Sequence, residues 1–145
     1  MFSRAHKYQK LSMTLMRLTR AYHTRLSIIA AKYDLTADQL LVLHALATTN
    51  SPLSIGKLSA KSIVQQPAIT KMAKQFELRG LITIRPSPSD KRKTLVTITP
   101  TGLSLIGEIQ NRITRNILPF ITGLDEPSRE TLASATEQLV KNLSA

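Results

Sequence analysis

A short basic loop carries the side chains best suited to contact another molecule. Asp90 is followed directly by Lys91, Arg92 and Lys93. An arginine at a hairpin tip can enter the narrow minor groove of DNA, where the negative potential is strongest, and a nearby aspartate can hold its guanidinium by paired hydrogen bonds. We therefore predict that Arg92 enters the minor groove, that Asp90 braces it, and that Lys91 and Lys93 bind phosphates. The alternative is a charged turn that only protects a sheet edge. The predicted contact residues of this loop are Ser87, Ser89, Asp90, Lys91, Arg92 and Lys93.

A second set of such side chains lies on one side of a predicted helix that begins near Gln66. At helical spacing, Ile69, Met72, Ala73 and Phe76 share one side, and the opposite side is small, polar and basic. That composition suits a helix in the major groove, with modest side chains near base edges and cations near phosphates. The alternative is an ordinary solvated helix face. The predicted contact residues are Gln65, Gln66, Pro67, Ala68, Thr70, Lys71 and Lys74.

The charge of the whole chain favours the same partner. Its 145 residues carry a formal net charge of +11, and the excess lies in residues 1–33 and 54–93. A surface this basic attracts polyanions, above all nucleic acid. The absence of cysteine excludes disulfides, thiolate metal sites and a cysteine nucleophile. No apolar run is long enough for a membrane helix, so we expect no membrane contact and a cytoplasmic protein.

Enzymatic and metal chemistry find little support in the sequence. The chain has no glycine-rich phosphate loop, nucleophile elbow or carboxylate pair, so we expect no enzyme and no cofactor. Its three histidines, His6, His23 and His44, lack the spacing of metal ligands, so we expect no metal site. His44 lies inside a very apolar segment and is expected to be a hydrogen-bonded residue of the core or of a pocket.

The elements that position these side chains begin with four predicted helices. Residues 8–33 form a long amphipathic helix, and residues 37–47 form a second, whose start has a capping box of Thr36 and Gln39. A third helix covers residues 55–62 with Ser54 as its cap, and a fourth runs from Gln66 to Gly80. The apolar stripe of the first helix consists of Tyr8, Leu11, Leu15, Leu18, Tyr22, Leu26, Ile29 and Tyr33.

After Gly80 the periodicity changes to that of strands. Residues 81–85 and 94–98 read as two strands joined by the basic loop, residues 52–55 as a short extended stretch, and two further helices follow from Pro100 and Asp125. The order predicts a mainly α protein with a small β-hairpin wing, a winged helix-turn-helix flanked by N- and C-terminal helices. A plain helical bundle would leave the hairpin unexplained.

An ordered set of motifs resembles the MarR family of winged-helix transcriptional regulators. The motifs are Leu35-Thr36-x-x-Gln39-x-x-x-Leu43-x-x-Leu46, Phe76-Glu77-x-x-Gly80-Leu81-Ile82, Asp90-x-Arg92 and Ile98-Thr99-x-x-Gly102. The resemblance implies one domain over residues 1–145, with a DNA-binding lobe at residues 35–103 and dimerisation helices at residues 1–34 and 104–145. It further implies a homodimer that places two recognition helices in successive major grooves, about 10 base pairs apart.

Two features of the sequence qualify and extend the resemblance. Ile63 and Gln65 stand where many family members have a glycine and a Ser or Thr cap, so the turn before the recognition helix is expected to differ. The C-terminal helices, in turn, carry more apolar surface than one small core needs, which supports a dimer independently. These apolar residues are Ile113, Ile117, Leu118, Phe120, Ile121, Leu124, Leu132, Leu139, Val140 and Leu143.

Members of this family commonly bind a small, often aromatic or anionic, effector, and the first helix has a face that suits one. Arginines can hold a carboxylate and methionine thioethers can accept a ring. The alternative is that the methionines pack in the dimer interface and that the arginines face phosphate or solvent. The candidate effector residues are Met13, Met16, Arg17, Arg20, His23 and His44.

These observations predict a sequence-specific regulator that binds double-stranded DNA. The expected form is a homodimeric repressor of a near-palindromic operator, released when an effector changes the separation of its recognition helices. One alternative is a winged-helix module that binds an acidic protein. The other is a nucleic-acid-binding protein without sequence preference, which would keep the salt dependence of affinity and lose the preference.

Overall fold

The computed structural model describes the backbone of residues 2–144 and the side chains of residues 6–143. Within this range the chain forms two compact units, the first ending at Ile109 and the second starting at Gln110. The boundary lies inside one helix, α5 (Pro100–Thr122). That residues 1–145 act as a single domain stays a prediction. Among the described residues, no helix is long and apolar enough to cross a membrane.

The first unit begins with the 30-residue helix α1 (Phe2–Ala31), which starts earlier than the predicted residue 8. Only its last turns are buried, through Leu26, Ile29 and Ala30. Most of the rest of the predicted apolar stripe is exposed, with Tyr8 62% and Leu18 56% accessible, and Leu15 and Tyr33 are half-buried. The stripe therefore extends well beyond the core of the first unit.

Helix α2 (Ala37–Ala47) confirms its predicted start and its central place in the core. The Thr36 hydroxyl accepts a hydrogen bond from the Gln39 amide at 3.2 Å, and the Gln39 side chain accepts one from the Thr36 amide at 2.9 Å. Leu43 is fully buried. The prediction that His44 lies in the core was wrong, because its side chain is exposed, whereas its place in a pocket stays a prediction. It lies on the one side of α2 that the core leaves open.

The helix-turn-helix consists of α3 (Ile55–Ser62) and α4 (Gln66–Leu78), as predicted. The Ser54 hydroxyl caps α3 by accepting a hydrogen bond from the Lys57 amide. Ile63 in the intervening turn has a left-handed backbone, with φ of 61°, where an L side chain is strained. The turn therefore keeps a backbone conformation that glycine adopts without strain, and the prediction that it differs here was wrong.

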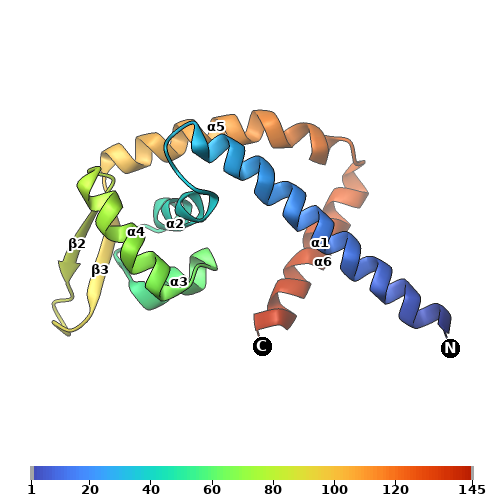
Figure 1. The fold of residues 1–145 in the computed structure, drawn as a ribbon, viewed down its shortest axis with the longest axis horizontal. Coiled ribbons are helices and arrows are strands. Elements are labelled where there is room, and N and C mark those ends of the chain that lie inside the picture. Colours follow the sequence, from blue (N-terminus) through green and yellow to red (C-terminus); the bar gives the residue numbers. More distant parts are fainter. Residues whose placement is uncertain (1, 145) are drawn as a thin grey trace. The chain divides into compact units, whose positions relative to one another are not determined.

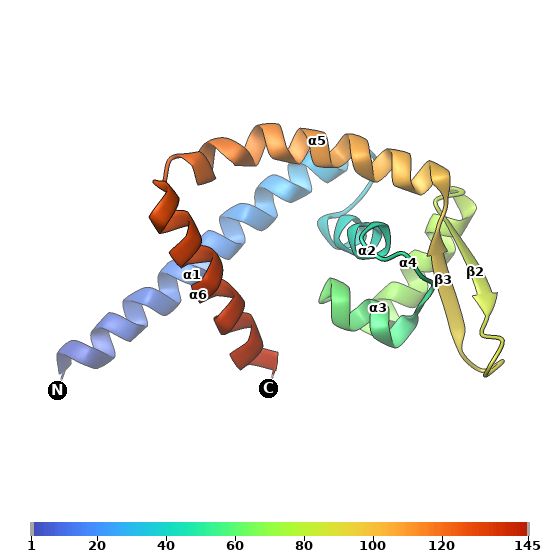
Figure 2. The ribbon, with the colours of Figure 1, turned by 180° about the vertical axis from the view of Figure 1, so that it is seen from behind.

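The wing is part of a three-stranded antiparallel sheet of order β1-β3-β2. Strands β2 (Ile82–Pro86) and β3 (Thr94–Ile98) form the predicted hairpin, with Ile84 opposite Val96. The predicted extended stretch is the short strand β1 (Leu53–Ser54), and its pairing with β3, with Leu53 opposite Val96, was not predicted. Leu53 and Val96 are both buried, so this pairing anchors the hairpin in the core. Figure 1 and Figure 2 show the hairpin beside α4, with its loop projecting from the unit.

The start of α5 is fastened to the base of the wing. Thr99 donates its hydroxyl hydrogen to the Gly80 carbonyl at 2.6 Å and its backbone N–H to the Leu81 carbonyl at 3.0 Å, and its hydroxyl accepts from the Gly102 amide. A Cβ at Gly102 would lie 2.3 Å from the Leu81 carbonyl oxygen. Glycine at this position therefore lets α5 approach the backbone of residue 81.

The second unit contains the end of α5 and helix α6 (Glu126–Ser144). Asp125 caps α6 by accepting a hydrogen bond from the Ser128 amide at 3.2 Å. This hydrogen-bonded turn lowers the pKa of Asp125, chiefly through the Ser128 side chain. Large apolar side chains lie exposed on both helices and in the turn between them: Leu118, Phe120, Ile121, Leu124, Leu132, Leu139, Val140 and Leu143.

Candidate nucleic-acid interface

Helix α4 has the two-sided character that its sequence predicts. Ile69 and Phe76 are fully buried and Ala73 nearly so, which fixes one side of the helix on the core. The predicted contact residues lie on the other side and are exposed, except for the half-buried Ala68. The side that carries Lys71 and Lys74 is therefore free to meet a ligand.

The first turn of α4 is built without a side-chain cap. Gln65 occupies the N-cap position, but its side chain makes no capping hydrogen bond, and Pro67 stands in the first turn. The side-chain amide of Gln65 thus does not cap the helix, as expected because glutamine is a poor N-cap residue. The uncapped N–H groups and the helix dipole favour an anion at this end. Thr70 donates its hydroxyl hydrogen to the Gln66 carbonyl, which leaves its oxygen as an acceptor.

The wing loop is closed by backbone hydrogen bonds that present its cations outward. The Ser87 N–H donates to the Lys93 carbonyl at 2.8 Å, and the Lys93 N–H donates to the Asp90 carbonyl at 2.9 Å. Ser87 is only 7% exposed, and its hydroxyl lies 3.0 Å from that of Ser89. Ser87 therefore shapes the loop and does not face a ligand. The Arg92 side chain is 93% exposed.

Asp90 braces Arg92 differently from the prediction. Its Oδ1 accepts the Arg92 backbone N–H at 3.0 Å and lies 3.4 Å from Arg92 Nε. The predicted pair of hydrogen bonds to the guanidinium is thus replaced by a single one, from Nε to the same oxygen that accepts the backbone N–H. Asp90 thus fixes the backbone of Arg92 and leaves the outer guanidinium nitrogens available to a partner.

Two further residues of this interface were missed at the level of sequence. The Glu77 carboxylate on α4 accepts a hydrogen bond from the Ile84 N–H at 3.2 Å, and so ties strand β2 to the helix. Arg85 is exposed on β2 and lines an open pocket of about 520 Å³ together with Pro86, Ser87, Pro88 and Lys91. The strand alternation of residues 82–85 was the signal that could have placed Arg85 outward.

The predicted effector residues do not share an enclosed site within one chain. Met13 and Met16 are 58% and 63% exposed, and Arg17 and Arg20 are exposed on the same helix. His23 Nε2 lies 4.0 Å from Asp38 Oδ1, which links α1 to α2. His44 lies exposed on α2. The effector site stays a prediction.

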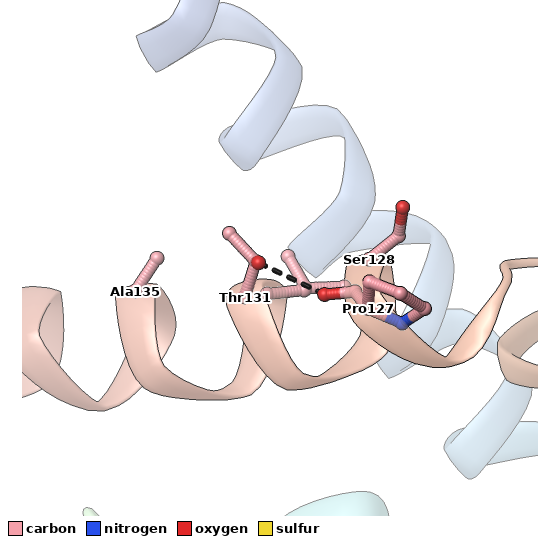
Figure 3. A pocket seen from close by; sticks show the side chains of 5 residues that line it. Pro127, Ser128, Thr131 and Ala135 are labelled. Carbon is pink, nitrogen blue, oxygen red and sulfur yellow. Dashed lines mark hydrogen bonds between the residues drawn. The ribbon is translucent and has the colours of Figure 1, made fainter.

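The second unit carries its own hollow, on the first turns of α6. Its volume is about 400 Å³, and Figure 3 shows Pro127, Ser128, Thr131 and Ala135 along one side of the helix. The Thr131 hydroxyl donates to the Pro127 carbonyl at 2.8 Å and is therefore engaged within the helix. This hollow and the wing pocket contain none of the predicted effector residues. Among the residues described, no group of three or more His, Asp or Glu could hold a metal ion.

Comparison with known proteins identifies the architecture. Residues 35–94 match the model of the MarR family. The chain is 32% identical over 130 residues to the HTH-type transcriptional repressor IacR of Pseudomonas putida, across 89% of this chain and 77% of that protein. Two solved structures have the same fold. Bordetella bronchiseptica BpsR, studied for regulation of its DNA binding by 6-hydroxynicotinic acid, superposes with a TM-score of 0.78 at 22% identity, over 89% of this chain and 91% of BpsR. The S. aureus MepR–DNA complex superposes with a TM-score of 0.79 at 14% identity, over 90% of this chain and 96% of MepR.

These matches bear directly on the interface. The family match covers α2, the helix-turn-helix, and the hairpin up to residue 94, which together carry the exposed face of α4 and the Asp90-x-Arg92 loop. The match to IacR extends over most of both chains. This protein belongs to the MarR family of winged-helix, DNA-binding transcriptional regulators.

Proposed function

We propose that the protein is a homodimeric repressor that binds a near-palindromic operator in double-stranded DNA and is released by a small effector. One observation carries the DNA-binding part of this proposal. The exposed polar and basic side of α4 lies beside a wing whose Arg92 is 93% exposed and whose turn is closed by Asp90. This arrangement supports a major-groove reader on α4 and a minor-groove reader at the tip of the wing, both within one compact unit.

Within this proposal each contact residue has a distinct task. Gln65, Gln66 and Thr70 present amide and hydroxyl groups at the start of α4, where base edges come within reach. Lys71 and Lys74 lie on the same side and neutralise phosphates. Arg92 inserts into the flanking minor groove. Specificity then comes from the polar residues and Arg92, and the salt dependence comes from the lysines.

The dimer follows from apolar surface that a single chain leaves open. In the second unit, Phe120 is 54% and Leu143 88% exposed. The N-terminal part of α1 adds Tyr8, Leu11 and Leu18. Exposed large apolar side chains in such number mark a protein–protein interface in each unit, and a two-fold dimer is the commonest way to bury them. Two α4 helices in one dimer would then read two half-sites about 10 base pairs apart.

The effector part rests on the chemistry of α1 and on a relative. BpsR is regulated by 6-hydroxynicotinic acid, a small aromatic anion. Met13, Met16, Arg20 and His23 lie along one side of α1 and supply thioethers and cationic groups that suit such a molecule. The effector must bind more tightly to the geometry that does not fit DNA, and operator DNA must weaken effector binding by the same factor.

The proposal is tested by selecting duplexes from a random-sequence library with the purified protein. We expect a near-palindrome whose half-sites lie about one helical turn apart. Light scattering should show a dimer, and a chain that ends at Gly123 should lose dimerisation and operator binding together. An enriched pool without any shared motif would favour sequence-independent binding. No enrichment at low salt would favour the protein-interaction module and overturn the proposal.

A further inference from the structure

The C-terminal end of the recognition helix is clamped to the end of α1 by one arginine. Arg79, the C-cap residue of α4, donates from Nη1 to the Asp34 carbonyl at 2.9 Å and from Nη2 to the Tyr33 carbonyl at 3.0 Å. These two carbonyls follow the last turn of α1, where the helix dipole is negative. A planar guanidinium that holds two successive carbonyls fixes direction as well as distance.

The same turn after α1 is tied to α5 by a side chain. The Tyr33 hydroxyl donates to Glu108 Oε1 at 3.2 Å, and Glu108 belongs to the part of α5 inside the first unit. Tyr33 thus meets α4 through its carbonyl and α5 through its hydroxyl. The end of the recognition helix and α5 are therefore separated by only two hydrogen-bonded contacts.

A second contact holds α4 one turn earlier. The Gln39 side chain donates from Nε2 to Gln75 Oε1 at 3.0 Å, while its own Oε1 accepts the Thr36 N–H in the capping box of α2. Gln75 and Arg79 stand four residues apart and so lie on one side of α4. This side is therefore anchored to the connection between α1 and α2, through residues 33 and 34, and to the first turn of α2.

We propose that Arg79, Tyr33 and Glu108 are positioning residues that set the angle of recognition helix α4 relative to α1 and α5. The inference rests on the proposed function, because α1 and α5 are the helices that would join the two subunits. Buried side chains hold α4 against the core, and the Glu77 carboxylate ties it to β2. The hydrogen bonds of Arg79, Tyr33 and Glu108, which we call the clamp, add a directional constraint at the C-terminal end of the helix. The clamp therefore determines which half-site spacing the dimer accepts, without touching DNA.

The test uses the selected operator and versions of it with one or two base pairs inserted or removed between the half-sites. The readout is the ratio of Kd values between altered and selected spacing. Arg79→Lys keeps the positive charge but cannot donate to both carbonyls at once as the guanidinium does. Tyr33→Phe removes only the hydroxyl group. Each should reduce the spacing preference by about tenfold, as loss of one charge-assisted or well-placed hydrogen bond would.

A conservative variant and a control complete the set. Glu108→Gln keeps an acceptor oxygen for Tyr33 but loses its charge, so it should reduce the spacing preference less than Tyr33→Phe does. Lys32→Gln removes a cation from the same segment, and within the described part of the chain its side chain makes no hydrogen bond or ion pair. It should weaken binding to all spacings alike.

The possible outcomes distinguish a failure of this inference from a failure of the proposed function. Folded Arg79→Lys and Tyr33→Phe proteins that keep the full spacing preference would overturn the inference and leave the proposed function intact. An equal loss of affinity at every spacing, with a lower Tm, would show a merely structural role and would also overturn it. If the unaltered protein itself shows no spacing preference, the proposed two-site dimer fails, and the inference fails with it.

Discussion

Gly102→Ala should loosen the joint between α5 and the wing. The added Cβ would lie 2.3 Å from the Leu81 carbonyl oxygen and 2.7 Å from Ile98 Cγ1. An ordinary contact begins at 3.4 Å, so the start of α5 must move away from residue 81 by about 1 Å. The nearest obstacle is backbone, which cannot rotate aside as a flexible side chain could.

The free-energy cost has three parts. Forcing a methyl group into a packed site costs roughly 1–3 kcal/mol. The movement also stretches the hydrogen bonds that Thr99 donates to Gly80 and Leu81, each worth about 1 kcal/mol. The higher helix propensity of alanine offsets this cost by up to about 1 kcal/mol of folding free energy. We expect a net loss of about 3 kcal/mol in the free energy of unfolding and a fall of roughly 10 °C in Tm.

Urea unfolding followed by circular dichroism measures this loss, at one fixed protein concentration because a dimer's stability depends on concentration. Gly107→Ala is the matched control, since it makes the same change in the same helix and its Cβ meets nothing within 4 Å in the described structure. The control should gain up to about 1 kcal/mol. Equal stabilities for the two variants would refute the reasoning, because α5 would then yield to the new methyl group without cost.

Four other perturbations address the interface and the helix termini. Arg92→Ala should cost about 1–3 kcal/mol of operator binding and relax specificity at the flanks of the site; unchanged affinity would remove Arg92 from the minor groove. Lys74→Ala should weaken binding to all duplexes alike and lower the salt slope by about one, whereas a sequence-selective loss would make Lys74 a base reader. Ile63→Gly should raise the free energy of unfolding by about 1 kcal/mol in denaturant titrations, because glycine relieves the strain of φ 61°; a loss would show that the Ile63 side chain makes stabilising contacts. Hydrogen bonding to Ser128 lowers the pKa of Asp125 below its ordinary value of 3.8. The ionised carboxylate therefore stabilises the folded state above pH 3.8, and this contribution is lost as the pH falls through the lowered pKa. Asp125→Asn should therefore flatten the acid-side loss of helicity below about pH 4, and an unchanged slope would contradict this assignment.

Local signals in the sequence predicted most of the fold. The Thr36–Gln39 capping box, the glycine after α4 and the strand alternation after Gly80 each depend on neighbours within four residues, and the structure confirms them. The two sides of α4 follow in the same way from helical spacing. Such features depend on short-range geometry, so they can be predicted from a single sequence.

The features that sequence missed depend on residues far apart in the chain. The pairing of β1 with β3 joins Leu53 to Val96, and a two-residue strand has no periodicity of its own. The Arg79 clamp spans more than 40 residues and ends on backbone carbonyls, which every residue possesses. His44 was placed inside because apolar neighbours surround it in sequence, although the open side of α2 is decided by tertiary packing.

The measurement that tests the central claim most directly is fluorescence anisotropy on duplexes tiled across the region upstream of the protein's own gene. The titrations are made at two salt concentrations, with scrambled duplexes as competitors. We predict tight binding to one near-palindromic tile that resists the competitor and weakens steeply as salt rises. Equal binding to the palindromic and the scrambled duplexes would contradict sequence-specific recognition by α4 and the wing.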